Sequence, residues 1–309
     1  MLTTSGYPIY ARLAFRRRLL NTFTFLVIFG VGSAFGSTVT DNGMQWASND
    51  VLGPVHNVRA RESTLRQVGN NDEWIEEESN HEWILTFDRA QTFTETVHLK
   101  PHVPGLSPRR YMCFVRDGYK RIVQFNTCDA ERHPIGGSRS VFLYDTQGHL
   151  IEERVEQLTG KVTVSSRNLY EYDSTGQKTR THTYSSDGSL VTIGTYHRDR
   201  EKNLLISEHR TADGEFQTKE AHMLDSRGRT IEVVSFDQQG GALSETHMSY
   251  DDHGKRVERV GSGRGVNVRE IDSYEYDERG NWTKKTNRRI QTSGEERTVT
   301  HRAIEYYPD

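Results

Sequence analysis

Histidines and cysteines are the residues of this chain best suited to chemistry, and their spacing predicts no built site. The 309 residues include 13 His and 2 Cys. His98 and His102 have the spacing of two metal ligands on a helix, but they stand at an expected strand end before a proline-containing loop, so we interpret them as surface residues. The 2 cysteines are too few for a four-thiolate zinc site or a disulfide scaffold. We therefore expect no metal site and no cofactor.

Other patterns that could support catalysis are weak. The sequence lacks His-Glu-x-x-His, Gly-x-Ser-x-Gly, Walker and Cys-x-x-Cys motifs. The Gly261, Gly263 and Gly265 run could approach a phosphate, but no helix start follows it to supply backbone amides. Aspartates in turns could contact calcium, but each would need several more oxygen ligands close by. We predict a protein that is not an enzyme.

Cys113 and Cys128 are the one pair that could oxidise. A two-residue turn at Asp117-Gly118 would place Ile122 opposite Cys113 and leave Cys128 roughly 20 Å further along the strand. That separation is too long for a disulfide. This register predicts free thiols, whereas a different register or a fold-back of residues 129–139 would join them, so the oxidation state stays open.

The first 36 residues have the order of a secretory signal. Four arginines between positions 12 and 18 precede an apolar stretch at 19–32, and small residues follow at Ala34 and Gly36. A retained membrane anchor is the alternative, but the stretch is short and contains polar residues. We expect a signal peptide over 1–36, a polar leader over 37–50, and export to the periplasm, the cell surface or the medium.

Charge limits the partners of the mature chain. Removing the signal, which holds four arginines and no acidic residue, takes the formal net charge from −3 to −7. A surface of that sign repels nucleic acid and anionic lipid. We expect an unidentified protein or glycan partner, no nucleic acid, and no membrane embedding after signal cleavage.

Aspartates recur every 26 residues in the second half of the chain, at Asp173, Asp199, Asp225, Asp251 and Asp277, and a glycine follows three residues later in four of these five units. Aspartate at the first position and glycine at the fourth are typical of hairpin turns. A second turn series lies between them, which leaves strands of about eight to ten residues. The pattern predicts antiparallel β-hairpins repeated along the chain.

Tyrosines stand one or three residues before several of these aspartates and would share one face of the sheet. They are Tyr170, Tyr172, Tyr250, Tyr274 and Tyr276. Stacked repeats would join them into an apolar strip that lets a polar chain fold. We interpret the rings as core; a stacking platform for sugars is the alternative.

The units Tyr144-Asp145-x-x-Gly148, Tyr172-Asp173-x-x-Gly176 and Tyr276-Asp277-x-x-Gly280-Asn281-Trp282 resemble the YD repeats of rearrangement-hotspot (RHS) proteins. The resemblance covers about 141–307 and is thin over 51–140. It implies β-hairpin repeats, a secreted or surface setting, and binding or encapsulation. The chain lacks the Asp-Pro-x-Gly-Leu motif and the following toxin domain, so the toxin-delivery role is not carried over.

Residues 51–140 form a degenerate repeat region with two long loops, and 141–309 form the regular one. The loops, 100–109 and 129–139, lie on the edge opposite the Asp-x-x-Gly turns. Because recognition often resides on loops held by a rigid scaffold, we predict partner binding there. The candidate residues are His102, Arg109, Arg110, Arg132 and His133.

Together these observations predict an all-β fold of antiparallel hairpin repeats, with a unit of about 26 residues, coiled into a curved or spiral sheet. The predicted function is a non-catalytic binding or structural module of the cell envelope. A hydrolase acting on envelope polysaccharide or peptidoglycan is one alternative. An outer-membrane barrel is another, since about 16 such strands could close, but it needs one uniformly apolar face, and both faces carry charges.

Overall fold

The computed structural model describes residues 51–69, 73–78, 81–90, 93–100, 110–263 and 265–308. All of them belong to one compact unit, Val31–Asp309. The expected signal segment and leader lie outside the described residues. None of the residues just named forms a helix of the length and apolarity needed to cross a membrane.

The described residues form strands and tight turns, and their ladders are antiparallel. The strands are β1 (Val55–Gln67), β2 (Trp74–Glu76), β3 (His81–Phe87), β4 (Phe93–Lys100), β5 (Arg110–Arg116), β6 (Ile122–Cys128), β7 (Pro134–Tyr144), β8 (Leu150–Gln157), β9 (Thr163–Tyr172), β10 (Lys178–Ser185), β11 (Leu190–Asp199), β12 (Leu204–Thr211), β13 (Phe216–Leu224), β14 (Thr230–Phe236), β15 (Ala242–Tyr250), β16 (Arg256–Gly263), β17 (Val266–Tyr276), β18 (Trp282–Gln291) and β19 (Gly294–Tyr306).

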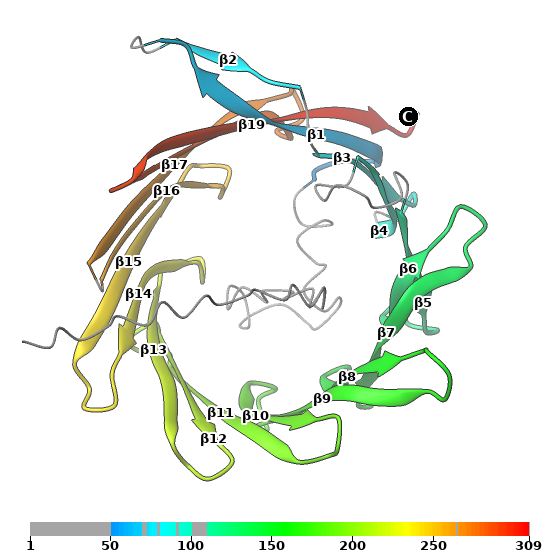
Figure 1. Ribbon diagram of the computed structural model, residues 1–309, viewed down its shortest axis with the longest axis vertical. Coiled ribbons are helices and arrows are strands. Elements are labelled where there is room, and N and C mark those ends of the chain that lie inside the picture. The colour runs from blue at the N-terminus through cyan, green and yellow to red at the C-terminus, as the bar shows by residue number, and fades with distance from the viewer. Residues whose placement is uncertain are drawn as a thin grey trace, which may run out of the picture. The chain divides into compact units, whose positions relative to one another are not determined.

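The sheet closes on itself. From β3 to β19 each strand pairs with the next, and β1 pairs with both β3 and β19. The result is a closed antiparallel barrel of 18 strands, while the short β2 pairs with the far end of β1. Figure 1 shows this ring, with β2 outside it. The predicted curved or spiral sheet is therefore wrong, although the described residues are all-β as expected.

Turn aspartates fix most hairpins at one rim of the barrel. Asp225 shows the pattern: its Oδ1 accepts hydrogen bonds from the amides of Arg227 and Arg229, both at 2.9 Å. The amide of Gly228 donates to the Asp225 carbonyl oxygen at 2.9 Å, and Gly228 has a φ of +78°. Glycine adopts this left-handed conformation without a steric penalty. We call this end of the barrel the aspartate rim.

The β5–β6 turn differs from the predicted two-residue turn. It spans Asp117 to Arg121, with Lys120 at a φ of 65°, and pairs Arg116 with Ile122. Cys113 then faces Asn126, and Cys128 stands two residues along the same face. The Cα atoms of Cys113 and Cys128 are 6.1 Å apart and the two cysteines form a disulfide. The preference for free thiols was wrong because it placed the turn too early.

The closing seam joins the two ends of the described chain. Val55 pairs with Tyr306, and the amide of Tyr307 donates to the Pro54 carbonyl oxygen at 2.7 Å. The buried core cluster lies beside this seam. It contains Val55, Val58, Leu85 and Phe87, with Val51, Trp83, Phe114, Ile304 and Tyr306 packed against it.

Asn281, which is 1% exposed, locks the seam. Its Oδ1 accepts from the Leu52 amide at 2.5 Å, and its Nδ2 donates to the Leu52 carbonyl oxygen at 2.7 Å. The same Nδ2 also lies 2.8 Å from the Tyr306 hydroxyl. One side chain thus satisfies the backbone of a segment 229 residues away, as a neighbouring strand would.

Candidate functional site

Strand register divides the barrel wall into an outer and an inner face. The short β2 pairs edge to edge with the end of β1 and lies outside the ring in Figure 1. Trp74 packs against the Arg297 guanidinium at 4.3 Å, and Glu76 pairs with His301 at 3.0 Å. Arg297 and His301 therefore share one face of the wall. The opposite face carries the buried polar residues Ser207, His222 and Asp272, as expected of the more crowded concave side of a closed sheet, so Arg297 and His301 face outward. Because directly paired residues share a face, the ladders extend this assignment to the other strands.

Ion pairs occur along the outer face. Arg269 contacts Glu258 at 2.7 Å, and Lys284 contacts Glu275 at 2.6 Å. Exposed apolar residues stand among these charges, as Val115, Leu143 and Val260 show. The outer face therefore alternates between paired charges and apolar side chains.

The inner face is polar and aromatic over most of the ring, and beside the seam it carries the buried apolar cluster of Val58 and Leu85. Serine and threonine line β15 at Ser244 and Thr246, which pair with Gly263 and Gly261. Charged side chains occur on the same face. They are Glu62, Arg116, Glu153, Lys178, Arg198, Glu220, Arg256, Arg259, Glu270, Asp272, Lys285, Arg289, Glu296 and Arg302. The charged and hydroxyl side chains of this wall point toward the inside of the ring.

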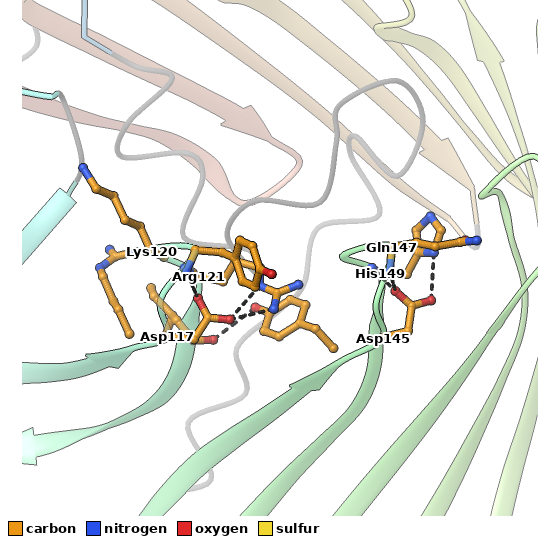
Figure 2. A network of polar contacts seen from close by, with 10 residues as sticks. Asp117, Lys120, Arg121, Asp145, Gln147 and His149 are labelled. Atoms are coloured by element: carbon orange, nitrogen blue, oxygen red, sulfur yellow. Dashed lines mark hydrogen bonds and ion pairs between the residues drawn. The ribbon is translucent and has the colours of Figure 1, made fainter.

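At the aspartate rim, a side chain from each of several turns contacts the tyrosine of the next hairpin. Figure 2 shows two consecutive turns, at Asp117 and Asp145. Arg121 pairs with Asp117 at 2.7 Å and lies over the Tyr144 ring at 4.5 Å. His149 pairs with Asp145 at 3.0 Å and stacks on the Tyr172 ring at 4.8 Å. Each contact links two hairpins, so the rim is tied around its circumference.

Tyrosine hydroxyls complete these links by donating backward to the preceding hairpin. Tyr144 donates to the Ile122 carbonyl oxygen at 3.0 Å, and Tyr172 to that of Leu150 at 2.8 Å. The tyrosines predicted as core thus do pack inside the wall. A cation or imidazole covers a ring face, which leaves that face closed to stacking by a sugar.

Asp145 and Asp117 have pKa values below the ordinary value of an aspartate. Partial burial acts to raise the pKa of Asp145, but hydrogen bonds from His149 and Gln147 and the charge of His149 bring it below the ordinary value. The pKa of Asp117 is lowered in the same way. Burial acts to raise it, but hydrogen bonds from Arg121 and Tyr119 have the larger effect and bring it below the ordinary value.

The predicted partner-binding residues are only partly described. His102 and Arg109 lie outside the described residues, and Arg110 is the first residue of β5. Arg132 and His133 lie in a tight turn that starts at Asp129, since β7 begins at Pro134; the expected long loop over 129–139 is wrong. Arg132 lies over the Tyr111 ring at 4.7 Å, and His133 pairs with Asp129 at 3.5 Å. Partner binding by the five residues stays a prediction.

Two features of the site escaped sequence reasoning. The residue four positions after a turn aspartate, arginine or histidine at 121, 149 and 229, carries the contact to the next tyrosine. This signal was readable, because the spacing repeats. Closure of the barrel could not be predicted from the repeat, because the same repeat pattern fits an open sheet and a closed one.

These observations define the chain as a closed antiparallel β-barrel with a polar inner wall. No protein-family model matches it, and no curated protein matches it. Among solved structures it is similar to a porin-like protein from Bacteroides uniformis, at 11% identity over 82% of this chain and 99% of that one, with a TM-score of 0.44. It is also similar to the TcdB2-TccC3 structure, at 13% identity over 71% of this chain and 15% of that one, with a TM-score of 0.27. At these scores neither likeness carries weight for function.

Three expectations are corrected by this architecture. The chain is not assigned to the YD or RHS repeats, because no family model matches and its sheet closes as a barrel. The binding or structural module, assigned to a curved or spiral repeat sheet, is withdrawn because the wall closes as a barrel, and its alternative, the envelope hydrolase, is withdrawn with it. The expectation that the chain stays clear of membranes is also withdrawn, because a closed barrel is the one β architecture that can span a bilayer. The disulfide is typical of an exported protein.

Proposed function

We propose that this protein is a porin-like, non-catalytic barrel whose water-filled lumen lets polar solutes cross the outer membrane. The observation that carries the proposal is the closure of 18 antiparallel strands around a polar inner wall. Barrels of about 16–18 strands are wide enough to leave an aqueous channel. An even strand number and antiparallel pairing throughout also fit this class.

The charged outer face is the feature that most challenges the proposal. Lipid-facing arginine and lysine cost roughly 2–4 kcal/mol each at the bilayer midplane. Pairing reduces the cost of moving a charge out of water but does not abolish it. Arg154, for example, contacts both Glu152 and Glu156, at 3.1 and 2.6 Å. Membrane insertion is therefore the decisive test.

Conductance across a planar lipid bilayer tests the proposal. We expect the purified mature chain to give stepwise, ohmic currents in potassium chloride. Thr246→Trp, which fills part of the inner wall, should lower the single-channel conductance. Ser249→Trp on the same strand faces outward and should leave it unchanged. A folded barrel that stays in aqueous solution without detergent and never conducts would overturn the proposal.

A further inference from the structure

A group of charged side chains occupies the inner wall where β16, β17 and β18 meet. Arg259 pairs in register with Glu270, and Glu270 with Arg289. Asp272 and Lys285 lie on the same face of β17 and β18. Arg256 extends from the adjoining end of β16 to reach both carboxylates. We call these four cations and two carboxylates the lumenal cation patch.

The two carboxylates of the patch are less exposed than its four cations. The side chain of Asp272 is 2% exposed and that of Glu270 is 16% exposed. By contrast, Arg259 is 40% and Arg289 is 45% exposed. Solute inside the barrel therefore meets mostly the positive groups.

Ion pairing does not neutralise the patch. Asp272 accepts a hydrogen bond from Asn287 at 2.7 Å and pairs with Lys285 at 3.2 Å and with Arg256 at 3.6 Å. Glu270 lies 3.4 Å from Arg256, 3.5 Å from Arg259 and 3.9 Å from Arg289.

The distances from Glu270 exceed those of charge-assisted hydrogen bonds. Glu296, an exposed acid, pairs in register with Arg289 on the same face. Counting it, three negative charges stand beside four positive ones, which leaves a surplus of +1 at neutral pH.

Small residues lie beside the patch on the same face. Arg259 is followed by the inward-facing Gly261, which pairs with Thr246 on β15 and with Val268 on β17. The guanidinium of Arg259 therefore borders wall that carries short side chains. A group larger than water can approach it from the lumen.

We propose that the lumenal cation patch binds oxyanions of the phosphate type, with Arg259 and Arg289 as the principal contacts and Arg256 and Lys285 as further sources of charge. Guanidinium groups present paired N–H donors that match the oxygens of phosphate. The inference deepens the proposed function, because it gives the passage a preference for anionic solutes.

Phosphate titration of the soluble or detergent-solubilised mature chain tests the patch without a membrane. We expect isothermal titration calorimetry with inorganic phosphate at low ionic strength to show binding. The double variant Arg259→Gln and Arg289→Gln should bind at least tenfold more weakly. The control, Arg269→Gln and Arg288→Gln, removes two arginines from the outer face and should bind as the unmodified chain does. Circular dichroism must show the same β content in all three.

The two proposals fail in different ways. A barrel that conducts but binds no phosphate, or binds it equally in the inner variant, overturns the patch and leaves the passage standing. A barrel that binds phosphate through the patch but never conducts overturns the passage alone. In a salt gradient, the reversal potential of a conducting barrel should show anion preference, and the inner variant should lose it.

Discussion

At the scale of single residues, the position three after a turn aspartate decides how easily a hairpin closes. Most such positions hold glycine, but Lys120 and Arg132 have φ values of 65° and 68°. A side chain in this left-handed region costs about 1–2 kcal/mol. We expect Lys120→Gly to raise the free energy of unfolding by about 1 kcal/mol, measured by chemical denaturation.

Gly148→Ala is the matched control for that substitution. Gly148 holds the same position in the next hairpin at a φ of +93°, and an added Cβ would make only an ordinary contact with Arg121. The strain is therefore in the backbone, and we expect the opposite sign, a loss of about 1 kcal/mol. A loss of stability in Lys120→Gly would contradict the assigned turn conformation.

Asn281 gives the second residue-scale prediction. Asn281→Ala would leave the part-buried Leu52 amide and carbonyl groups without their partner. We expect a loss of about 1–2 kcal/mol in the free energy of unfolding, since water can partly replace the two lost hydrogen bonds. Gln177→Ala, at the same turn position but beside exposed Arg200, should cost much less. Equal losses would show that Asn281 has no special part in the seam.

At the scale of elements, the β5–β6 hairpin is cross-linked by Cys113–Cys128 across a sequence separation of 15 residues. A loop of that length restricts the unfolded chain by about 3 kcal/mol. We expect Cys113→Ser with Cys128→Ser to lower the unfolding free energy by about that amount. Intact mass under non-reducing conditions should first show two fewer hydrogens than in the reduced chain. A chain that has the mass of the reduced form, and whose two cysteines react with an alkylating agent, would contradict the hairpin register.

The turns also predict how stability depends on pH. The pKa values of Asp117, Asp145 and Asp225 lie below the ordinary 3.8: burial raises them, but hydrogen bonds and neighbouring charges lower them further. A depressed carboxyl pKa stabilises the fold above the unfolded-state pKa, and this contribution is lost as pH falls through the folded value. We expect the unfolding free energy to fall below about pH 4, measured by denaturation at stepped pH.

Asp225→Asn tests the source of that pH dependence. The amide oxygen can still accept from the Arg227 and Arg229 backbone, but the charge opposite the Arg229 guanidinium is gone. Stability should therefore fall less steeply with acid in the variant than in the unmodified chain. An unchanged slope would assign the acid sensitivity to other carboxylates.

Sequence reasoning reached the elements because their signals are local. An aspartate followed three residues later by glycine marks a hairpin turn wherever it occurs, and Asp173, Asp225 and Asp277 form such turns. The β5–β6 turn failed because Lys120 takes the left-handed position that glycine usually marks. One misplaced turn shifted the register of the hairpin, and the disulfide was missed with it.

At the scale of the whole molecule, closure depends on contacts that the repeat does not encode. Each hairpin fixes only its neighbours, so the same 26-residue pattern fits an open sheet or a ring. The ring is completed by β1 against β19 and by Asn281 against Leu52, which are distant in sequence. The charges on the outer face also argued against a closed barrel at the level of sequence, because an outer-membrane barrel was expected to have one uniformly apolar face.

An engineered disulfide across the seam tests closure directly. Arg59 on β1 and Ala303 on β19 pair in register on the outer face. Paired positions in an antiparallel ladder have Cα atoms about 4.5–5.5 Å apart, within the range a disulfide bridges. We therefore expect Arg59→Cys with Ala303→Cys to oxidise fully under mild conditions, measured by intact mass and by protection from alkylation.

The matched control is Arg59→Cys with Arg167→Cys, which places the second thiol on the outer face of β9. That strand is far from β1 in the ring of Figure 1, so no intramolecular bond should form. In an open spiral, β1 and β19 would be free edges held apart, and the seam pair would stay reduced like the control. Cross-linking of the seam pair alone therefore requires a wall without edges, the condition under which 18 strands can enclose a lumen.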